Sequence, residues 1–398
     1  MKRVFISDLH IGDGSAKDDF FFDKELVNFI EDMSQIEDVE LFIVGDGFEV
    51  LESRVVKEIG LVSFDEVLEA LDETVIDEIE KKHSEVFETL KKFSRRHRVY
   101  YVVGNHDYHI LKNRKLQNAL KNRFEKFEIL PYYYDPHSKL LVLHGNQFDV
   151  INRFTVDRKT KKVIPPLGDY IARYMMINFD SQVVNFAPED IIRDYDNVRP
   201  LLDVFHWFDY VTEIYDLNID LVELWLKSFL GMLKTKEARK WMKNNFPRTH
   251  WLSKVFVNRF GGVELGKVLV RSIYTLRKLR RVDYLQRWAK SILKGNLRWK
   301  EFMTGYHGDL HEVEEVDILV MGHVHHFTYR IVPTTQGKKL YVNCGSWRPV
   351  LEKIGLRKKH GFHRKAELPK IIMDFSGKNV EVKASITNVL GKIQGGDS

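Results

Sequence analysis

Cysteine is almost absent from the sequence, because Cys344 is the only one among 398 residues. A single thiol excludes a disulfide framework and a CxxC metal or redox motif, and it favours a reducing compartment. Long apolar runs are absent too, since no window approaches the roughly 20 residues that a membrane-spanning helix needs. Only three apolar residues separate Arg3 from the polar Ser7 and Asp8, so no signal peptide is predicted. We therefore expect a cytoplasmic protein without a transmembrane segment.

Repeats and low-complexity tracts are also missing, and the composition is that of an ordinary globular protein. Hydrophobic residues make up 44% and charged residues 30%, which argues against a disordered or collagen-like chain. The length predicts two to three domains at about 150 residues each. A chain of this size buries roughly three quarters of its unfolded surface, so it needs no disulfides to be stable.

The net charge of +5 conceals a strongly basic segment. Residues 234–301 contain 19 Lys or Arg against 4 Asp or Glu, a net charge of +15, and the rest of the chain sums to −10. Six of the seven tryptophans lie between residues 200 and 300, namely Trp207, Trp225, Trp241, Trp251, Trp288 and Trp299. This stretch is therefore a distinct module by composition.

Short apolar runs alternate with amphipathic stretches over the first part of the chain. The runs at 4–6, 41–44, 99–103, 140–143 and 318–321 are rich in β-branched residues and predict buried strands. The stretches 24–34, 64–93 and 110–127 predict helices between them. This alternation predicts an α/β fold in which helices cover a sheet. Residues 329–333, 339–343 and 371–375 predict further strands of a closing antiparallel sheet.

Residues 153–311 break this rhythm and predict an almost wholly helical insertion. We therefore expect an α/β domain formed by residues 1–152 and 312–398, with a helical cap inserted between them. Three interpretations of the basic, Trp-rich part stay open. The first is a solvated helical bundle with a Trp core, and the second is a surface that binds nucleic acid. The third is a lid on an anionic membrane surface, and in that case the protein would be peripheral to the membrane.

Each predicted buried strand is followed at once by side chains that commonly bind metals. Seven such residues follow the five strands: Asp8, His10, Asp46, Asn105, His144, His323 and His325. Because ligands bind at the carboxyl ends of strands in layered α/β folds, these side chains are expected to share one site. Seven ligands exceed the four of one zinc ion and indicate two metals with a bridging carboxylate, roughly 3.5–4 Å apart. Imidazole, carboxylate and amide ligands together favour Mn, with Fe or Zn as alternatives.

This set closely resembles the motifs of the calcineurin-like metallophosphoesterase superfamily. The motifs here are Asp8-Leu9-His10, Gly45-Asp46-Gly47-Phe48-Glu49, Gly104-Asn105-His106-Asp107, His144-Gly145 and Gly322-His323-Val324-His325. The resemblance covers roughly residues 1–152 and 312–376 and implies two mixed β-sheets sandwiched between helices. It also implies two ligand sets that share Asp46. The first is Asp8, His10, Asp46 and His325, and the second is Asp46, Asn105, His144 and His323.

The resemblance implies hydrolysis of a phosphodiester or diphosphate bond by metal-activated hydroxide. His106, beside the ligand Asn105, is the candidate for protonating the leaving oxygen or stabilising the phosphoryl charge. Asp107 is expected to orient the His106 ring, with helix capping as the alternative. Glu49 is interpreted as a supporting residue rather than a ligand. A second His-Gly pair at His307 rivals His144, but no buried strand precedes it.

The finer resemblance is to the UDP-2,3-diacylglucosamine diphosphatase branch of this superfamily. The Gly-Asp-x-Phe-Glu form, the His-Gly order at His144 and the segment Asn343-Cys344-Gly345-Ser346-Trp347 carry it. His106 stands where that branch usually has Arg, and the large insertion is a second departure. A nuclease acting on DNA or RNA is the enzymatic alternative. A non-catalytic metal-binding scaffold is the other alternative, although such scaffolds typically lack motif residues and none is missing here.

Overall fold

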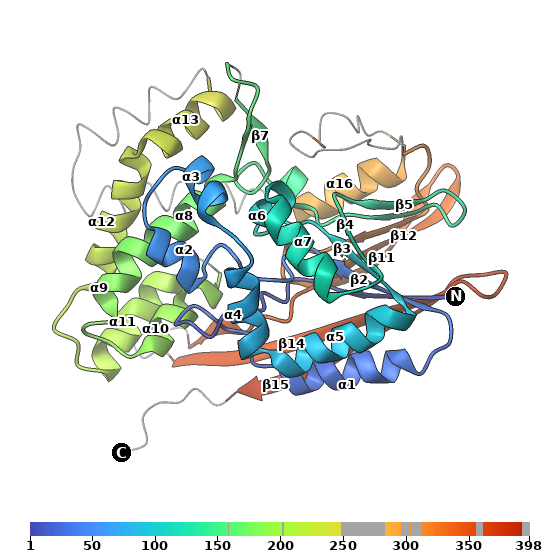
Figure 1. The fold of residues 1–398 in the computed structure, drawn as a ribbon, viewed down its shortest axis with the longest axis horizontal. Coiled ribbons are helices and arrows are strands. Elements are labelled where there is room, and N and C mark those ends of the chain that lie inside the picture. Colours follow the sequence, from blue (N-terminus) through green and yellow to red (C-terminus); the bar gives the residue numbers. More distant parts are fainter. Residues whose placement is uncertain are drawn as a thin grey trace.

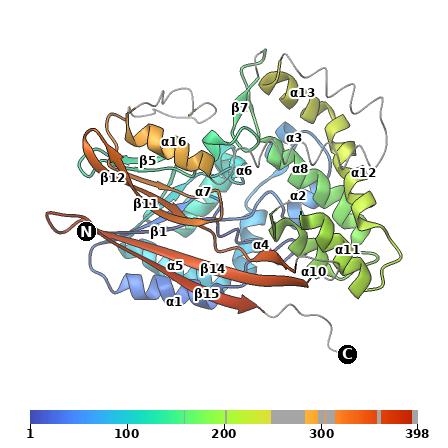
Figure 2. The same ribbon diagram turned by 180° about the vertical axis from the view of Figure 1, so that it is seen from behind.

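The computed structural model describes residues 1–157, 159–200, 203–247, 283–295, 303, 313–355 and 361–391. Two β-sheets pack face to face, and helices cover their outer faces (Figure 1). A group of helices lies beside one end of this sandwich, and Figure 2 shows the same arrangement from behind. The fold class is therefore the α/β sandwich of two mixed sheets that the sequence predicts.

The first sheet has eight strands in the order β4–β3–β2–β1–β14–β13–β9, and β15 also pairs with β14. These strands are β1 (Lys2–Ile6), β2 (Val39–Val44), β3 (Arg98–Val102), β4 (Phe127–Leu130), β9 (Val198–Arg199), β13 (Val350–Ile354), β14 (Gly361–Asp374) and β15 (Glu381–Gly391). Strands β1 to β4 are parallel, whereas β14 runs antiparallel to β1. The carboxyl ends of β1, β2 and β3 therefore meet at one edge.

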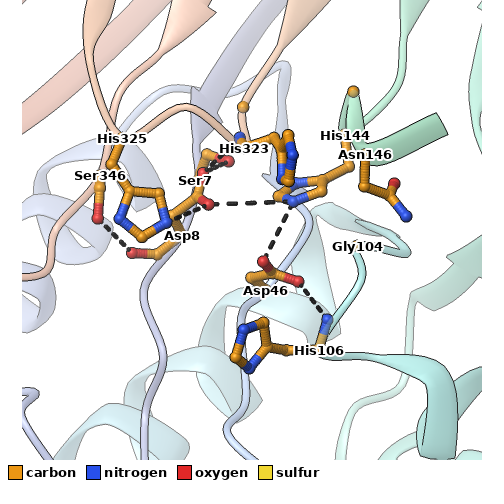
Figure 3. Close-up of polar contacts among 12 residues, drawn as sticks. Ser7, Asp8, Asp46, Gly104, His106, His144, Asn146, His323, His325 and Ser346 are labelled. Atoms are coloured by element: carbon orange, nitrogen blue, oxygen red, sulfur yellow. Dashed lines mark hydrogen bonds and ion pairs between the residues drawn. The ribbon is translucent and has the colours of Figure 1, made fainter. Parts of the chain in front are cut away.

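The second sheet has five strands in the order β11–β12–β10–β6–β5. They are β5 (Tyr133–Asp135), β6 (Leu140–Val142), β10 (Ile318–Met321), β11 (Phe327–Thr334) and β12 (Gly337–Cys344). The central three, β6, β10 and β12, are parallel, so their carboxyl ends also meet at one edge. This edge faces the corresponding edge of the first sheet, and the loops of both sheets reach one place between them (Figure 3).

The apolar runs are continuous because alternate residues enter two different cores. Phe5, Phe42 and Val102 lie in the core between the two sheets. Their neighbours Ile6 and Ile43 point the other way, into the core beneath the helices. At about 25 cal/mol per Å² of apolar surface, such two-sided burial is the main stabilising term for these strands.

The first part of the chain forms seven α-helices, and several of them cover the outer face of the first sheet (Figure 1). They are α1 (Asp23–Ser34), α2 (Arg54–Ile59), α3 (Phe64–Ala70), α4 (Thr74–Lys82), α5 (Ser84–Arg96), α6 (Tyr108–Lys112) and α7 (Arg114–Arg123). The predicted stretch 64–93 is thus three helices rather than one. Helix α3 begins at a capping box of Ser63 and Glu66, and α4 ends at His83, where α5 starts.

The predicted helical region, residues 153–311, contains seven described α-helices. These are α8 (Leu167–Met175), α9 (Ser181–Val183), α10 (Glu189–Asp194), α11 (Val204–Ile214), α12 (Leu221–Lys234), α13 (Lys236–Asn245) and α16 (Asp283–Leu293). The region also contains elements that the sequence did not predict. They are a π-helical turn η2 (Met176–Asp180), a 3-10 turn η3 (Tyr195–Asn197), the hairpin of β7 (Thr155–Val156) with β8 (Val163–Ile164), and β9. No helix in the described part of the chain is both long and apolar enough to span a bilayer.

The helical region shares its hydrophobic core with the sandwich. Helix α16 packs on β10, β11 and β12, and Leu285 and Ile292 join Leu319 and Tyr341 in one cluster. Strand β9, from the same region, pairs with β13 in the first sheet. The predicted strands at the five apolar runs are confirmed. The three later predicted strands are present within β11, β12 and β14, but they do not form one sheet, because β11 and β12 join the second sheet while β14 joins the first.

His83 supplies a pH-dependent contribution to stability at the junction of α4 and α5. The His83 ring is buried. Its Nδ1 lies 2.7 Å from Asp23 Oδ1, and its Nε2 lies 3.1 Å from Asp18 Oδ2. Burial alone would lower the pKa of His83, but these two carboxylates raise it to about 9. The stabilisation is therefore complete below the unfolded pKa of about 6.5 and is lost as pH rises through 9.

We expect the unfolding free energy of the metal-free protein to fall between pH 6.5 and 9 by up to about 3 kcal/mol through His83. The variant His83→Gln should be less stable at pH 6 and should lack this part of the pH slope. Urea unfolding of both proteins at pH 6, 7.5 and 9 measures it. Equal slopes for the two proteins would contradict the assignment of the proton to His83.

Candidate metal centre

The loops that follow β1, β2, β3, β6 and β10 carry the predicted ligands, and Figure 3 shows Asp8, Asp46, His144, His323 and His325 gathered at one place. Asp8 and His10 follow β1, and Asp46 follows β2. The remaining four come from the other three loops, namely Asn105, His144, His323 and His325. All seven side chains are buried or nearly so, although they lie up to 317 positions apart in the sequence.

Asp8 lies at the β1 side of this cluster. Its Oδ1 is 3.1 Å from Nε2 of His325 and 4.0 Å from Nε2 of His144. The other oxygen, Oδ2, accepts a hydrogen bond from the backbone N–H of His323 at 3.1 Å and lies 2.5 Å from the Ser7 hydroxyl. One oxygen is thus held by the protein, and the other faces two imidazoles.

Asp46 occupies the middle of the cluster. Its Oδ2 is 3.1 Å from Nε2 of His144 and 3.9 Å from Nε2 of His10. Its Oδ1 accepts the backbone N–H of His106 at 2.9 Å. The charges of the neighbouring histidines outweigh burial and hold the pKa of Asp46 well below its usual value. A carboxylate between His10 and His144 is where a bridging ligand belongs.

Unusual backbone conformations aim the side chains at this centre. Five of the seven predicted ligands have left-handed φ angles: Asp8 (52°), His10 (50°), Asp46 (50°), His323 (74°) and His325 (55°). Such conformations cost about 1–3 kcal/mol each in non-glycine residues and persist only where the surroundings enforce them. Glycine is required next to them, because a Cβ at Gly104 would lie 2.2 Å from Asp46 Oδ1.

The hydrogen-bond partners of the predicted ligands show that these residues are suited to bind divalent metal ions. Within the described part of the chain, His10 Nε2 and Asn105 Oδ1 are buried here without a hydrogen-bond partner, while Asp8 Oδ1 and His144 Nε2 face other ligand-type atoms, His325 Nε2 and Asp46 Oδ2, each at 3.1 Å. The opposite nitrogen of His144, Nδ1, donates to the Val44 carbonyl at 2.8 Å, which directs Nε2 to the centre. Unpaired buried polar atoms that share one centre with carboxylates and imidazoles are the arrangement expected of metal ligands.

Among the residues that the structure describes, three overlapping groups have ligand atoms within 4.8 Å of one another. They are Asp8, His10 and His325; His10, Glu49 and His106; and Asp8, Asp46 and His144. His323 joins them through its ring, whose centroid lies 5.2 Å from that of His144. The described geometry therefore offers more than one position for a metal.

Glu49 supports two of the histidines. Its Oε2 lies 2.7 Å from Nδ1 of His10 and 2.9 Å from Nδ1 of His106. A carboxylate on Nδ1 fixes the imidazole and makes Nε2 the stronger ligand, so Glu49 fits the supporting role expected of it. Burial alone would lower the pKa of His106, but the charges of Glu49 and Asp46 raise it well above its usual value.

The expectation that Asp107 orients the His106 ring is corrected by the geometry. The buried Asp107 carboxylate instead accepts hydrogen bonds from the backbone N–H of Asp46 at 2.9 Å, the N–H of Gly104 at 2.8 Å and the Tyr101 hydroxyl at 2.6 Å. Glu49 is the carboxylate at the His106 ring. In the described structure Asp107 makes no side-chain capping bond to α6 either. Asp107 ties the β2 and β3 loops together, and burial raises its pKa to about 7.

Sequence reasoning gave little weight to two residues that contact the predicted ligands. Asp149 Oδ2 lies 3.4 Å from Nε2 of His323. The Ser346 hydroxyl donates to the Asp8 carbonyl at 3.1 Å. Ser346 lies in the segment after β12 that carried the finer resemblance, which was the only signal in the sequence for it. The rival His307 lies outside the described residues.

A two-sheet α/β sandwich with Asp and His side chains gathered at its strand ends is the kind of site that metal-dependent hydrolases use. The comparison with protein families agrees, since the model for the calcineurin-like phosphoesterases matches residues 1–327. The chain therefore belongs to this family. The match includes all seven predicted ligands and runs through the helical region. No curated protein matches the sequence.

Proposed function

We propose that this protein is a dinuclear metal-dependent hydrolase that cleaves a phosphodiester or diphosphate bond. The observation that carries the proposal is the gathering of buried carboxylate oxygens and imidazole nitrogens around Asp46, in overlapping groups of described residues whose ligand atoms lie within 4.8 Å of one another. Asp8, His10, Asp46 and His325 would hold one ion. Asp46, Asn105, His144 and His323 would hold the second, and Asp46 would bridge the two.

Two bound dications would neutralise phosphoryl charge and lower the pKa of a water towards about 7. The residues of the chain do the rest. Glu49 holds the His106 ring at the rim of the site, where the ring is 19% exposed. His106 donates a proton to the leaving oxygen or a hydrogen bond to the charged phosphoryl group. Asp107 acts at a distance, by fixing the loops that carry Asp46 and Asn105.

The donor set bears on which metal the site selects. Imidazole nitrogens, carboxylate oxygens and one amide oxygen suit Mn, Fe or Zn better than Ca or Mg. Mn is the first choice in this proposal, with Fe or Zn as the alternatives.

After loading with Mn and removal of free metal, the wild-type protein should carry close to two ions per chain. The reason is the inventory of seven ligands around one bridging carboxylate, which one four-coordinate ion cannot use. Metal analysis of the gel-filtered protein, with circular dichroism to verify the fold, provides the measurement. One ion or none in a folded sample would refute the dinuclear site.

For the substrate we propose a UDP-diacylglucosamine-type diphosphate. The resemblance carried by the Gly45–Glu49 motif, the His144-Gly145 order and the Asn343–Trp347 segment supports it. In that last segment Asn343 Nδ2 donates to the Gly322 carbonyl at 2.6 Å and Ser346 contacts the Asp8 carbonyl. The segment on which the finer resemblance rests thus packs directly behind two ligand motifs. The alternative is a nuclease, favoured by the net charge of +15 over residues 234–301.

A Mn-supplemented activity panel tests the function and separates the two substrates. It compares a generic phosphodiester, a phosphomonoester, UDP-diacylglucosamine and single-stranded DNA. The proposal expects hydrolysis of the diphosphate with the highest kcat/KM. A preference for single-stranded DNA would favour the nuclease. No hydrolysis of any phosphodiester or diphosphate by protein that carries two metals would favour the non-catalytic scaffold.

We also propose that residues 153–311 form an insertion that determines substrate choice in a cytoplasmic enzyme. Its described helices lie beside the sandwich, and the chain enters the region shortly after His144 and leaves it shortly before His323 (Figure 1). An anionic membrane surface or a nucleic acid would bind through its basic part, of which residues 248–282 and 296–301 lie outside the described structure.

A further inference from the structure

Residues 12–22, which we name the linking loop, follow the ligand His10 and lead into α1. Two charged side chains of this loop, Lys17 and Asp19, are buried and contact the helical region. We infer that Lys17 and Asp19 are positioning residues through which the helical region holds the metal ligands His10 and Asp8. The inference rests on the proposed metal centre.

Lys17 is enclosed almost entirely by acidic and aromatic groups. Its Nζ lies 3.5 Å from Asp180 Oδ2, forms an ion pair with Asp196 and stands 4.1 Å from the centre of the Tyr195 ring. These three residues belong to η2 and η3 of the helical region. Because a buried ammonium is costly without counter-charges, Lys17 depends on the helical region for its position.

The ammonium group of Lys17 is also connected to His10 by contacts through two glutamates, Glu52 and Glu49. Lys17 Nζ lies 3.7 Å from Glu52 Oε1. The backbone N–H of Glu52 donates to Glu49 Oε1 at 3.2 Å, and Glu49 Oε2 is 2.7 Å from Nδ1 of His10. The segment that Lys17 contacts therefore also fixes the carboxylate that orients a predicted ligand.

Asp19 makes the corresponding connection to Asp8. Its Oδ2 accepts a hydrogen bond from Asn197 Nδ2 of the helical region at 2.7 Å and two from the Arg348 guanidinium at 2.8 and 2.6 Å. The backbone N–H of Arg348 donates to Ser346 Oγ at 2.9 Å, and Ser346 Oγ contacts the Asp8 carbonyl at 3.1 Å. A continuous chain of polar contacts thus runs from Asn197 to Asp8.

These contacts matter because Asp8 and His10 are held in left-handed backbone conformations. Residues in such conformations relax unless neighbouring contacts over-determine them. The linking loop begins two residues after His10, and its buried Lys17 and Asp19 are fixed partly by residues 180, 195, 196 and 197. The helical region is therefore part of the support of the metal centre, and replacing it with a short linker would disturb the ligands as well as substrate choice.

Two variants test this inference by metal binding, independently of activity. Asn197→Ala removes one neutral donor from Asp19 and leaves the Arg348 pair. Lys17→Met removes the charge, and Lys17→Arg is the conservative partner that should restore function. Asp194→Asn is the matched control, since Asp194 is equally buried in α10 but pairs with Arg364 of β14.

We expect Asn197→Ala to weaken Mn binding about 3–10-fold and Lys17→Met about 10–100-fold, in the range of supporting contacts behind metal ligands. Calorimetry and electron paramagnetic resonance of Mn titrations give these affinities, and thermal melts verify folding. Asp194→Asn and Lys17→Arg should bind Mn as the wild type does. Lys17→Met leaves three carboxylates close together without their counter-charge, so this variant can unfold. In that event the Mn affinity of Asn197→Ala alone tests the inference.

Unchanged Mn affinity in folded Asn197→Ala would overturn the inference, as would an equal loss in Asp194→Asn. These outcomes are distinct from failure of the proposed function. A wild-type protein that binds two Mn ions but hydrolyses no phosphate ester would refute the function, while the affinity comparison among variants would still test Lys17 and Asp19.

Discussion

Replacing Asp46 with asparagine should reduce phosphoesterase activity by more than about 100-fold and release one or both metal ions. Asp46 Oδ2 lies between His144, at 3.1 Å, and His10, at 3.9 Å, which belong to different proposed ligand sets. Losses of 10–100-fold follow from mutations behind metal ligands, so removal of a bridging charge should cost more. Asparagine has nearly the same shape and can still accept the backbone N–H of His106, so the loop should stay in place.

Metal analysis and kcat/KM of Asp46→Asn, measured beside the wild type, test this expectation. Asp157→Asn is a suitable control, because Asp157 is also buried but pairs with Lys240 next to the β7–β8 hairpin. That control should keep both metals and full activity. If Asp46→Asn retained two ions and activity within tenfold of the wild type, Asp46 could not be the bridging ligand.

Replacing His106 with alanine should leave both metals bound and slow turnover by about 10²–10⁴-fold, the usual contribution of a general acid. Glu49 lies at Nδ1 of His106, which makes Nε2 the nitrogen that can deliver a proton. The defect should depend on the leaving group. A nitrophenyl phosphodiester, whose leaving oxygen needs little protonation, should be hydrolysed by the variant with a smaller loss than an alkyl diester.

Comparison of kcat for the two diesters, together with metal analysis, checks this role. Equal losses for both leaving groups would favour stabilisation of phosphoryl charge over proton donation. Loss of a metal ion from His106→Ala would make His106 a ligand, since His10, Glu49 and His106 form one of the groups with ligand atoms within 4.8 Å. Either result would revise the mechanism without changing the family.

Much of the fold and the candidate site could be predicted from local patterns. The five buried strands could be predicted because residues such as Phe5 and Ile6 enter cores on opposite faces of the sheet, which makes the runs continuously apolar. The candidate ligands could be predicted because polar residues at the carboxyl ends of parallel strands meet at one edge of a sheet. Helix boundaries within 64–93 and short strands such as β9 were missed, since tertiary pairing rather than local pattern forms them.

What the sequence by itself determined is the identity of the ligand-type residues and the strands that carry them. Only the tertiary structure decided which carboxylate serves which partner. Asp107 follows His106 directly but bonds to the backbone of Asp46, while Glu49, 57 positions earlier, holds the His106 ring. The support of Asp8 likewise comes from Ser346, 338 residues away. Such roles depend on contacts between distant segments, and adjacency in the sequence carries no information about them.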